Sequence, residues 1–81
     1  MTKGEYRVGI SFNPSNDDMV GKIKRAAADL IDLIDGIGME GVAPGGISSN
    51  PEVMRLKALA QTHIEDAAMW AVKAATKTAA Q

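Results

Sequence analysis

One aromatic and several basic residues gather in the first third of the sequence. Phe12 stands between Arg7 on its N-terminal side and the pair Lys22 and Lys24 on its C-terminal side. An aromatic ring can stack on a nucleobase, and lysine ammonium groups can neutralise phosphates. This combination of residue types indicates a nucleotide site. The structural alternative is that Phe12 packs near Met19 and fixes the start of a helix.

A catalytic interpretation finds less support. His63, Glu65 and Asp66 stand close together in a stretch without glycine or proline, where a histidine or carboxylate could act as a general base. No nucleophile, phosphate-binding loop or metal-ligand spacing accompanies them. We therefore expect that the protein is not an enzyme, has no catalytic residues and uses no cofactor.

A metal site is not expected either. The sequence has no cysteine and a single histidine, which argues against a zinc site. Asp29, Asp32 and Asp35 repeat every three residues, and a row of metal ligands is one interpretation of that spacing. A solvated helix face produces the same alternation of Asp with Leu and Ile, and we favour that interpretation.

Length and composition describe one small globular domain. The 81 residues are 46% hydrophobic and 23% charged, which is typical of a folded chain. A net charge of −1 gives no strong attraction to duplex nucleic acid or to a membrane surface. No apolar run reaches the roughly 18 residues that span a bilayer. We expect a single soluble domain over residues 1–81 in a reducing compartment.

The residues before Pro14 alternate between apolar and polar types. The apolar positions are Tyr6, Val8, Ile10 and Phe12. A period of two predicts an extended segment, and the proline ends it. Residues 1–14 are therefore expected to form a short extended arm.

Two helices joined by a glycine-rich loop follow this arm. Ser15 is a suitable N-cap, and apolar residues at steps of three and four predict a helix over residues 15–35. Residues 36–50 contain five glycines and a proline, and this composition predicts a loop. An Asn–Pro pair, with proline at the first helical position, begins a long helix over residues 51–77.

The long helix is apolar on two faces, which one neighbouring helix cannot cover. Its alanines would allow other helices to pack closely, and an exposed apolar strip on a soluble protein marks an interface. Association is also a common way to stabilise so short a chain. We therefore expect an all-α fold, a helical hairpin with a short extended N-terminal arm, assembled into a homo-oligomer.

Two stretches carry a resemblance to a known family. They are RVGISFNPSNDDMVGKIKRAAADLIDLID and, after the loop, RLKALAQTHIEDAAMWAVKAATK. The most telling residues are Phe12, Asn13 and Pro14, then Ile23 and Lys24, and in the long helix Thr62, His63, Ala68, Met69 and Trp70. Over about residues 5–77 the chain resembles small phage-encoded hairpin proteins, the cyclic-nucleotide sponges of the anti-CBASS and anti-Thoeris type.

The resemblance implies a function and an assembly. Such proteins act in the cytoplasm of the infected bacterial host, where they bind cyclic immune signals without cleaving them and so block CBASS or Thoeris effectors. They are homo-oligomers, commonly hexamers built as a trimer of dimers. One pocket, between two subunits, takes cyclic dinucleotides or cyclic ADP-ribose isomers. There Phe12 would stack a base, with Tyr6 as a substitute, Lys24 would contact phosphate, and Arg7 and Lys22 would lie nearby.

The resemblance also implies a second pocket, for cyclic trinucleotides, where three subunits meet. The arginine of that pocket corresponds best to Arg55, and Gln61 and His63 follow it along the same helix.

An alternative function remains open at this point. An oligomeric helical protein could dock a host protein through Met69, Trp70 and the alanine-rich face, and bind no nucleotide. In that case Phe12 would serve only to pack the start of the first long helix.

Overall fold

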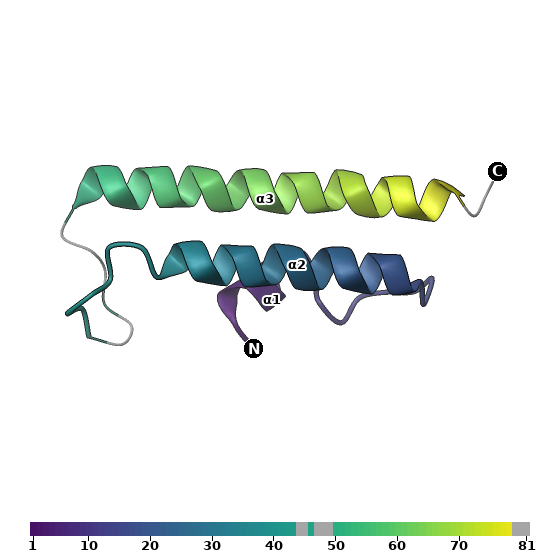
Figure 1. The fold of residues 1–81 in the computed structure, drawn as a ribbon, viewed down its shortest axis with the longest axis horizontal. Helices are drawn as coiled ribbons and strands as arrows, with labels where there is room; N and C mark the ends of the chain where they lie inside the picture. Colours follow the sequence, from purple (N-terminus) through teal and green to yellow (C-terminus); the bar gives the residue numbers. More distant parts are fainter. Residues whose placement is uncertain (44–45, 47–49, 79–81) are drawn as a thin grey trace.

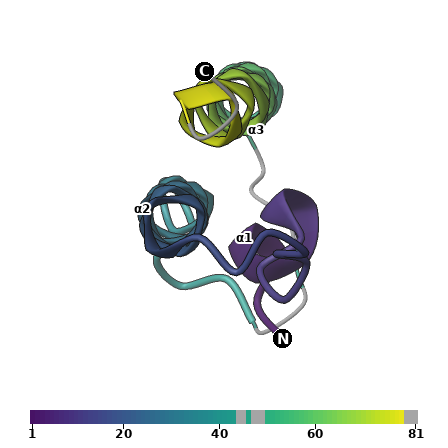
Figure 2. The same ribbon diagram turned by 90° about the vertical axis from the view of Figure 1, so that its right-hand side faces the viewer.

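Three helices make up the regular structure of the part of the chain that the computed structural model describes, residues 1–43, 46 and 50–78. They are α1 (Lys3–Val8), α2 (Asp18–Asp35) and α3 (Pro51–Thr78). Helices α2 and α3 lie antiparallel along the length of a flat molecule of 49 × 22 × 12 Å (Figure 1). Helix α1 lies beside α2, and α3 lies above both in the view of Figure 2. The predicted all-α class is confirmed, and the described residues include no strand.

The prediction of an extended N-terminal arm is wrong, because Lys3–Val8 forms α1. A reciprocal capping box starts this helix: Thr2 Oγ1 accepts from the backbone N–H of Glu5 at 3.1 Å, and Glu5 Oε1 accepts from the backbone N–H of Thr2 at 2.8 Å. Gly9 ends it in the left-handed conformation, with φ 64°. A helix of six residues is too short to display the helical period, so the alternation of apolar residues was misleading.

Helix α1 lies so close to α2 that their backbones touch. Gly4 is buried, and a β-carbon at this position would lie 2.1 Å from the carbonyl oxygen of Ala28. The backbone N–H of Gly4 donates to Asp32 Oδ1 at 2.7 Å, and Lys3 Nζ donates to Asp35 Oδ1 at 3.0 Å. Asp32 and Asp35 therefore bind α1, and the interpretation of this acidic row as a solvated helix face is wrong for both of them.

Helix α2 begins three residues later than predicted. Its N-cap is Asp17, whose carboxylate accepts from the backbone N–H of Met19 at 2.7 Å, while Ser15 lies in the preceding turn. Asn13 holds that turn, because its side chain donates to the carbonyl of Asp17 at 3.0 Å and accepts from Ser15 Oγ at 3.0 Å. The turn passes through Asn16 with φ 54°.

The start of α3 agrees with the predicted cap. Asn50 Oδ1 accepts from the backbone N–H groups of Glu52 and Val53 at 3.1 and 3.2 Å, and Pro51 is the first helical residue. The predicted loop over residues 36–50 falls partly outside the described residues, which omit 44–45 and 47–49. Its described part consists of turns, in which Gly38 and Gly41 have φ 70° and 77°.

The apolar interior is small for a chain of this length. Its buried members are Val20, Ala27, Ala28, Ile31 and Ala68. Large apolar side chains remain exposed on α3, namely Leu56, Leu59, Met69 and Trp70. The second apolar face predicted for this helix is thus uncovered in a single chain. No helix within the described ranges is long and apolar enough to cross a membrane.

Candidate nucleotide-binding site

Lys24 is the centre of the candidate site. It lies on α2 with only 7% of its surface exposed, and its ammonium group donates to two backbone carbonyls. Nζ donates to the carbonyl of Gly9 at 2.9 Å and to the carbonyl of Phe12. An ammonium group has three N–H donors, so a third remains for an anion after these two bonds. Lys24 therefore ties the segment that follows α1 to α2 and keeps one donor for a ligand.

Phe12 places its ring beside this ammonium group. The Lys24 Nζ lies 5.4 Å from the ring centroid, within the range of a cation–π contact. The Phe12 side chain is nevertheless 71% exposed, so most of the ring surface is open. A hydrophobic staple would bury Phe12 against Met19, but Met19 is exposed as well. The structure favours a ring that is available for stacking.

Arg7 joins α1 to α3 next to the lysine. Its Nε donates to Glu65 Oε1 at 2.7 Å and its Nη2 donates to Thr62 Oγ1 at 3.4 Å. Arg7, Lys24 and Glu65 form the polar wall of a groove of about 230 Å³. The full lining of this groove is Arg7, Val8, Lys24, Glu65, Ala68, Met69 and Val72. It is thus a mixed groove, with two cations, one carboxylate and an apolar floor.

Glu65 and Thr62 are site residues that sequence reasoning missed. Glu65 was considered only as a candidate general base, whereas here it is the ion-pair partner of Arg7. Arg7 and Glu65 are 58 positions apart, so no local pattern could have paired them. Within the described residues, no group of three or more His, Cys, Asp or Glu side chains is placed to hold a metal ion.

Lys22 does not share this groove. It lies exposed on α2, two positions before Lys24, and residues at that spacing do not face each other on a helix. Among the described residues it forms no ion pair. Tyr6, the other aromatic near the site, is 76% exposed on α1. The structure therefore brings Arg7, Phe12 and Lys24 together and leaves Lys22 apart.

Gln61 is separated from the other residues expected to bind a cyclic trinucleotide. Only 1% of its surface is exposed, and it lies between α2 and α3. Its Nε2 donates to the carbonyl of Ile31 at 3.0 Å and to Asp35 Oδ1 at 3.2 Å, while its Oε1 accepts from Lys3 Nζ at 2.9 Å. Its amide group thus holds the three helices together inside one chain.

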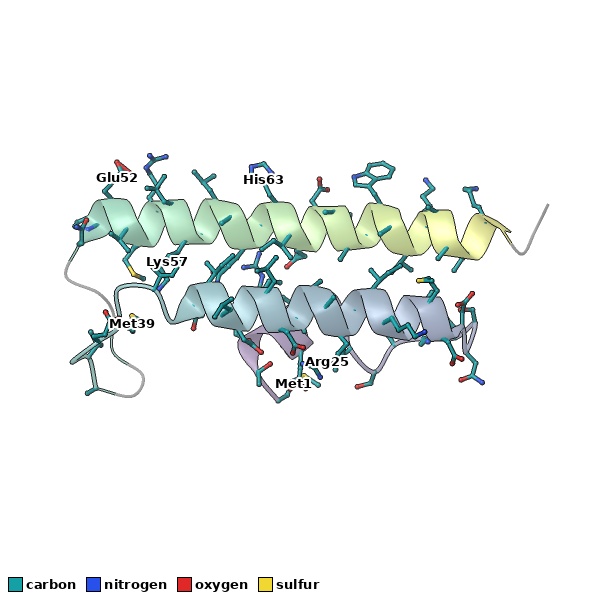
Figure 3. The ribbon with its side chains drawn as sticks, viewed as in Figure 1. Met1, Arg25, Met39, Glu52, Lys57 and His63 are labelled. Carbon is teal, nitrogen blue, oxygen red and sulfur yellow. The ribbon has the colours of Figure 1, made fainter. Side chains whose placement is uncertain are left out.

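Arg55 and His63 lie on the outer part of α3. Both are exposed, and His63 points away from α2 (Figure 3). Arg55 pairs with Glu52 one turn earlier, with Nη2 and Oε1 2.6 Å apart. A pair this exposed contributes little to stability, so the guanidinium can exchange its partner for a ligand.

Comparison with protein families agrees with the helical hairpin of the structure. A family model described as the Acb2/Tad1 hairpin domain matches residues 4–76, from α1 to the last turns of α3. No curated protein and no solved structure matched the chain significantly. The resemblance inferred from the sequence is thus confirmed at the level of the family, whose members bind their ligands without catalysis. The chain belongs to the Acb2/Tad1 hairpin domain family, a family of phage cyclic-nucleotide sponges.

Proposed function

We propose that this protein binds cyclic dinucleotides intact at Phe12 and Lys24, and so withholds them from the effectors of CBASS or Thoeris defence. The observation that carries the proposal is the exposed Phe12 ring, which lies 5.4 Å from an ammonium group with one donor to spare. A base would stack on the ring, a contact worth about 1–3 kcal/mol. A ligand phosphate would accept the remaining N–H of Lys24 as a charge-assisted hydrogen bond.

The pocket that we propose needs two copies of the chain. One Phe12 ring covers one face of one base, whereas a cyclic dinucleotide carries two bases related by an approximate two-fold axis. A two-fold homodimer would supply a ring and a lysine to each half of the ligand. The exposed apolar side chains of α3, such as Leu59 and Trp70, would provide the surface for this association. A trimer of such dimers gives the hexamer that the resemblance implies.

A second pocket in the same assembly would take cyclic trinucleotides. Arg55 and His63 support this part of the proposal, because both are exposed on α3 where three copies could present them to one ligand. Gln61 is left out of the proposed pocket, since its amide bonds are used inside the hairpin. Cyclic ADP-ribose isomers remain candidate ligands of the first pocket. The proposed place of action is the cytoplasm of the infected bacterium.

The test is equilibrium titration of Phe12→Ala with a panel of cyclic dinucleotides. We expect affinity to fall by about 1–3 kcal/mol, which is roughly 5- to 150-fold. Stability should change by less than about 0.5 kcal/mol, because the ring is exposed. Tyr6→Ala is the matched control, an equally exposed aromatic on α1 that should leave affinity unchanged. Unchanged affinity together with a clear loss of stability in Phe12→Ala would contradict the proposal.

Docking of a host protein is the second candidate function. It is favoured by the exposure of Met69 and Trp70, the latter with Lys73 Nζ 5.3 Å from its ring centroid. A docking protein would bind none of the nucleotides. Its Trp70→Ala variant would keep the wild-type oligomeric mass, whereas in the sponge we expect that substitution to weaken association between copies.

A further inference from the structure

We propose that Gly4 and Asp32 are positioning residues of the nucleotide site, an inference that rests on the proposed function. Neither residue touches the groove of Arg7 and Lys24. Both act through α1. The position of α1 against α2 determines whether residues 9–12, which follow α1, can reach Lys24.

The first step is the backbone contact at Gly4. A β-carbon there would lie 2.1 Å from the carbonyl oxygen and 2.9 Å from the α-carbon of Ala28. Both atoms belong to the backbone of α2, which cannot move aside as a side chain can. Only glycine therefore allows α1 to lie at this depth, and any larger residue must push the helix outwards.

The second step is the hydrogen bond that fixes α1 along and around its axis. The backbone N–H of Gly4 is in the first turn of α1 and has no acceptor within that helix. Asp32 Oδ1 accepts it at 2.7 Å, in a bond to a charged group between two fixed elements. Lys3, one residue earlier, donates to both Asp35 and Gln61 and so adds a second anchor on the same side.

The position of α1 also affects Lys24 and Phe12, the two residues proposed to bind the nucleotide. On α2, Lys24 precedes Ala28 by four residues and so occupies the same face one turn away. On the other chain segment, Ile10 N–H donates to the Glu5 carbonyl at 3.0 Å and Phe12 N–H donates to the Gly9 carbonyl at 2.9 Å. Backbone hydrogen bonds thus connect α1 to the segment that carries the Gly9 and Phe12 carbonyls. These two carbonyls accept from the ammonium group of Lys24. A shift of α1 would move those carbonyls and the Phe12 ring with it.

The main experiment compares Gly4→Ala with wild type in titrations with four cyclic dinucleotides, namely 3′,3′-cyclic GMP–AMP, cyclic di-AMP, cyclic di-GMP and 3′,3′-cyclic UMP–AMP. We expect the Kd of every dinucleotide that wild type binds to rise by about 5- to 150-fold, as expected when a stacking contact is lost. Gly36→Ala is the matched control: Gly36 is exposed, its φ is −77°, and an added β-carbon would make only an ordinary contact at 3.4 Å. This variant should bind as wild type does.

Amide hydrogen exchange in the absence of ligand tests directly whether residues 9–12, which follow α1, keep their position. The amides of Ile10 and Phe12 should exchange faster in Gly4→Ala, while the amides of α2 and α3 keep their wild-type protection. Cyclic triadenylate binding, where wild type shows it, should not change, because Arg55 and His63 are exposed on α3 and are not part of the segment that follows α1.

Asp32 offers a graded test of the same idea. Asp32→Ala removes the acceptor of the Gly4 N–H and should weaken dinucleotide binding. Asp32→Asn keeps an oxygen that can accept this bond and should restore most of the affinity. Charge alone cannot explain that ordering, since both variants lose the same carboxylate.

The outcomes are distinct. Faster exchange at Ile10 and Phe12 with unchanged dinucleotide affinity would overturn the inference while leaving the proposed function standing. Unchanged amide exchange at Ile10 and Phe12 in Gly4→Ala would overturn the inference as well, because the position of α1 on α2 would then not depend on glycine. Absence of any dinucleotide binding by wild type would instead overturn the proposed function, and the positioning role with it.

Discussion

Two buried lysines of the described residues make the same kind of contact in regions for which we propose different roles. Lys24 is 7% exposed and donates to the carbonyls of Gly9 and Phe12. Lys57 is 6% exposed and donates to the carbonyls of Asp35 and Ile37, each at 2.8 Å. Figure 3 shows Lys57 pointing from α3 toward the loop-side end of α2.

The surroundings of the two lysines distinguish structure from function. Lys57 meets carbonyls at and beyond the C-terminus of α2, where a cation satisfies acceptors that the helix leaves unpaired. Among the described residues no aromatic ring stands over it, and its groove neighbours are aliphatic: Ile34, Ile37, Val53, Leu56 and Ala60. Lys24 lies under an exposed ring and beside Arg7. A buried lysine alone is therefore no indication of a ligand site, and the uncovered Phe12 ring beside Lys24 is what supports the proposed site there.

The largest expected effect is a loss of cyclic dinucleotide affinity when Lys24, but not Lys57, is replaced. Lys24→Met should lower cyclic dinucleotide affinity by about 100-fold or more, because it removes a charge-assisted bond to phosphate, worth about 1.5–3 kcal/mol, and releases Phe12. Lys57→Met is the matched control and should bind as wild type does at a temperature where it is folded. Titration calorimetry on both variants would decide, and equal losses would contradict the separation of roles.

The next effect concerns stability. Lys57→Met leaves two carbonyls between α2 and α3 without their donor, so the free energy of unfolding should fall by about 2–4 kcal/mol. Chemical denaturation at a fixed chain concentration measures it. Lys22→Met serves as control, since Lys22 is exposed and should change stability by less than about 0.5 kcal/mol. A Lys57→Met variant as stable as wild type would mean that its carbonyl contacts contribute nothing.

The smallest expected effect is a weakening of the contact between α1 and α2 at acid pH. The backbone N–H of Thr2, followed by the Arg25 guanidinium, lowers the pKa of Glu5 from 4.5 to about 2. The bond from Lys3, followed by that from Gln61, also lowers the pKa of Asp35. A folded-state pKa below the unfolded value means that the unfolded chain binds more protons at acid pH. The docking of α1 is therefore fully stabilised above about pH 4.5 and weakens as the pH falls toward 2.

NMR shifts of the α1 amides would measure this transition. Glu5→Gln should remove most of it, whereas Glu52→Gln, which alters an exposed pair on α3, should leave it in place. An α1 that stays docked and unchanged down to pH 2 would show that these carboxylates do not hold it.

Local signals were sufficient for much of the fold. The cap at Asn50 and the first residue of α3 followed from an Asn–Pro pair. Phe12 was grouped with Lys24 because the first precedes the predicted helix and the second lies near its start. Helix α1 was missed because it has fewer than two turns, so its hydrophobic period could not appear. The useful signal was the capping box of Thr2 and Glu5, four residues before the pattern that was read as a strand.

The inward face of α3 could not be predicted from apolar periodicity. Lys57 and Gln61 occupy it, because their long side chains reach carbonyl groups of α2 that need donors. A pattern of apolar residues assigns such polar side chains to the solvent. The resemblance grouped Gln61 with Arg55 and His63 in one pocket, whereas the structure buries the first and exposes the other two.

The central claim is that copies of this chain hold a cyclic nucleotide intact. Native mass spectrometry of the purified protein, mixed with cyclic di- and trinucleotides and cyclic ADP-ribose isomers, measures the subunit number and the mass of bound ligand together. We expect a homo-oligomer, a hexamer in its full form, that carries a cyclic dinucleotide of unchanged mass and loses it in Lys24→Met. An oligomer that binds nothing in the panel, or that releases a cleaved product, would contradict it.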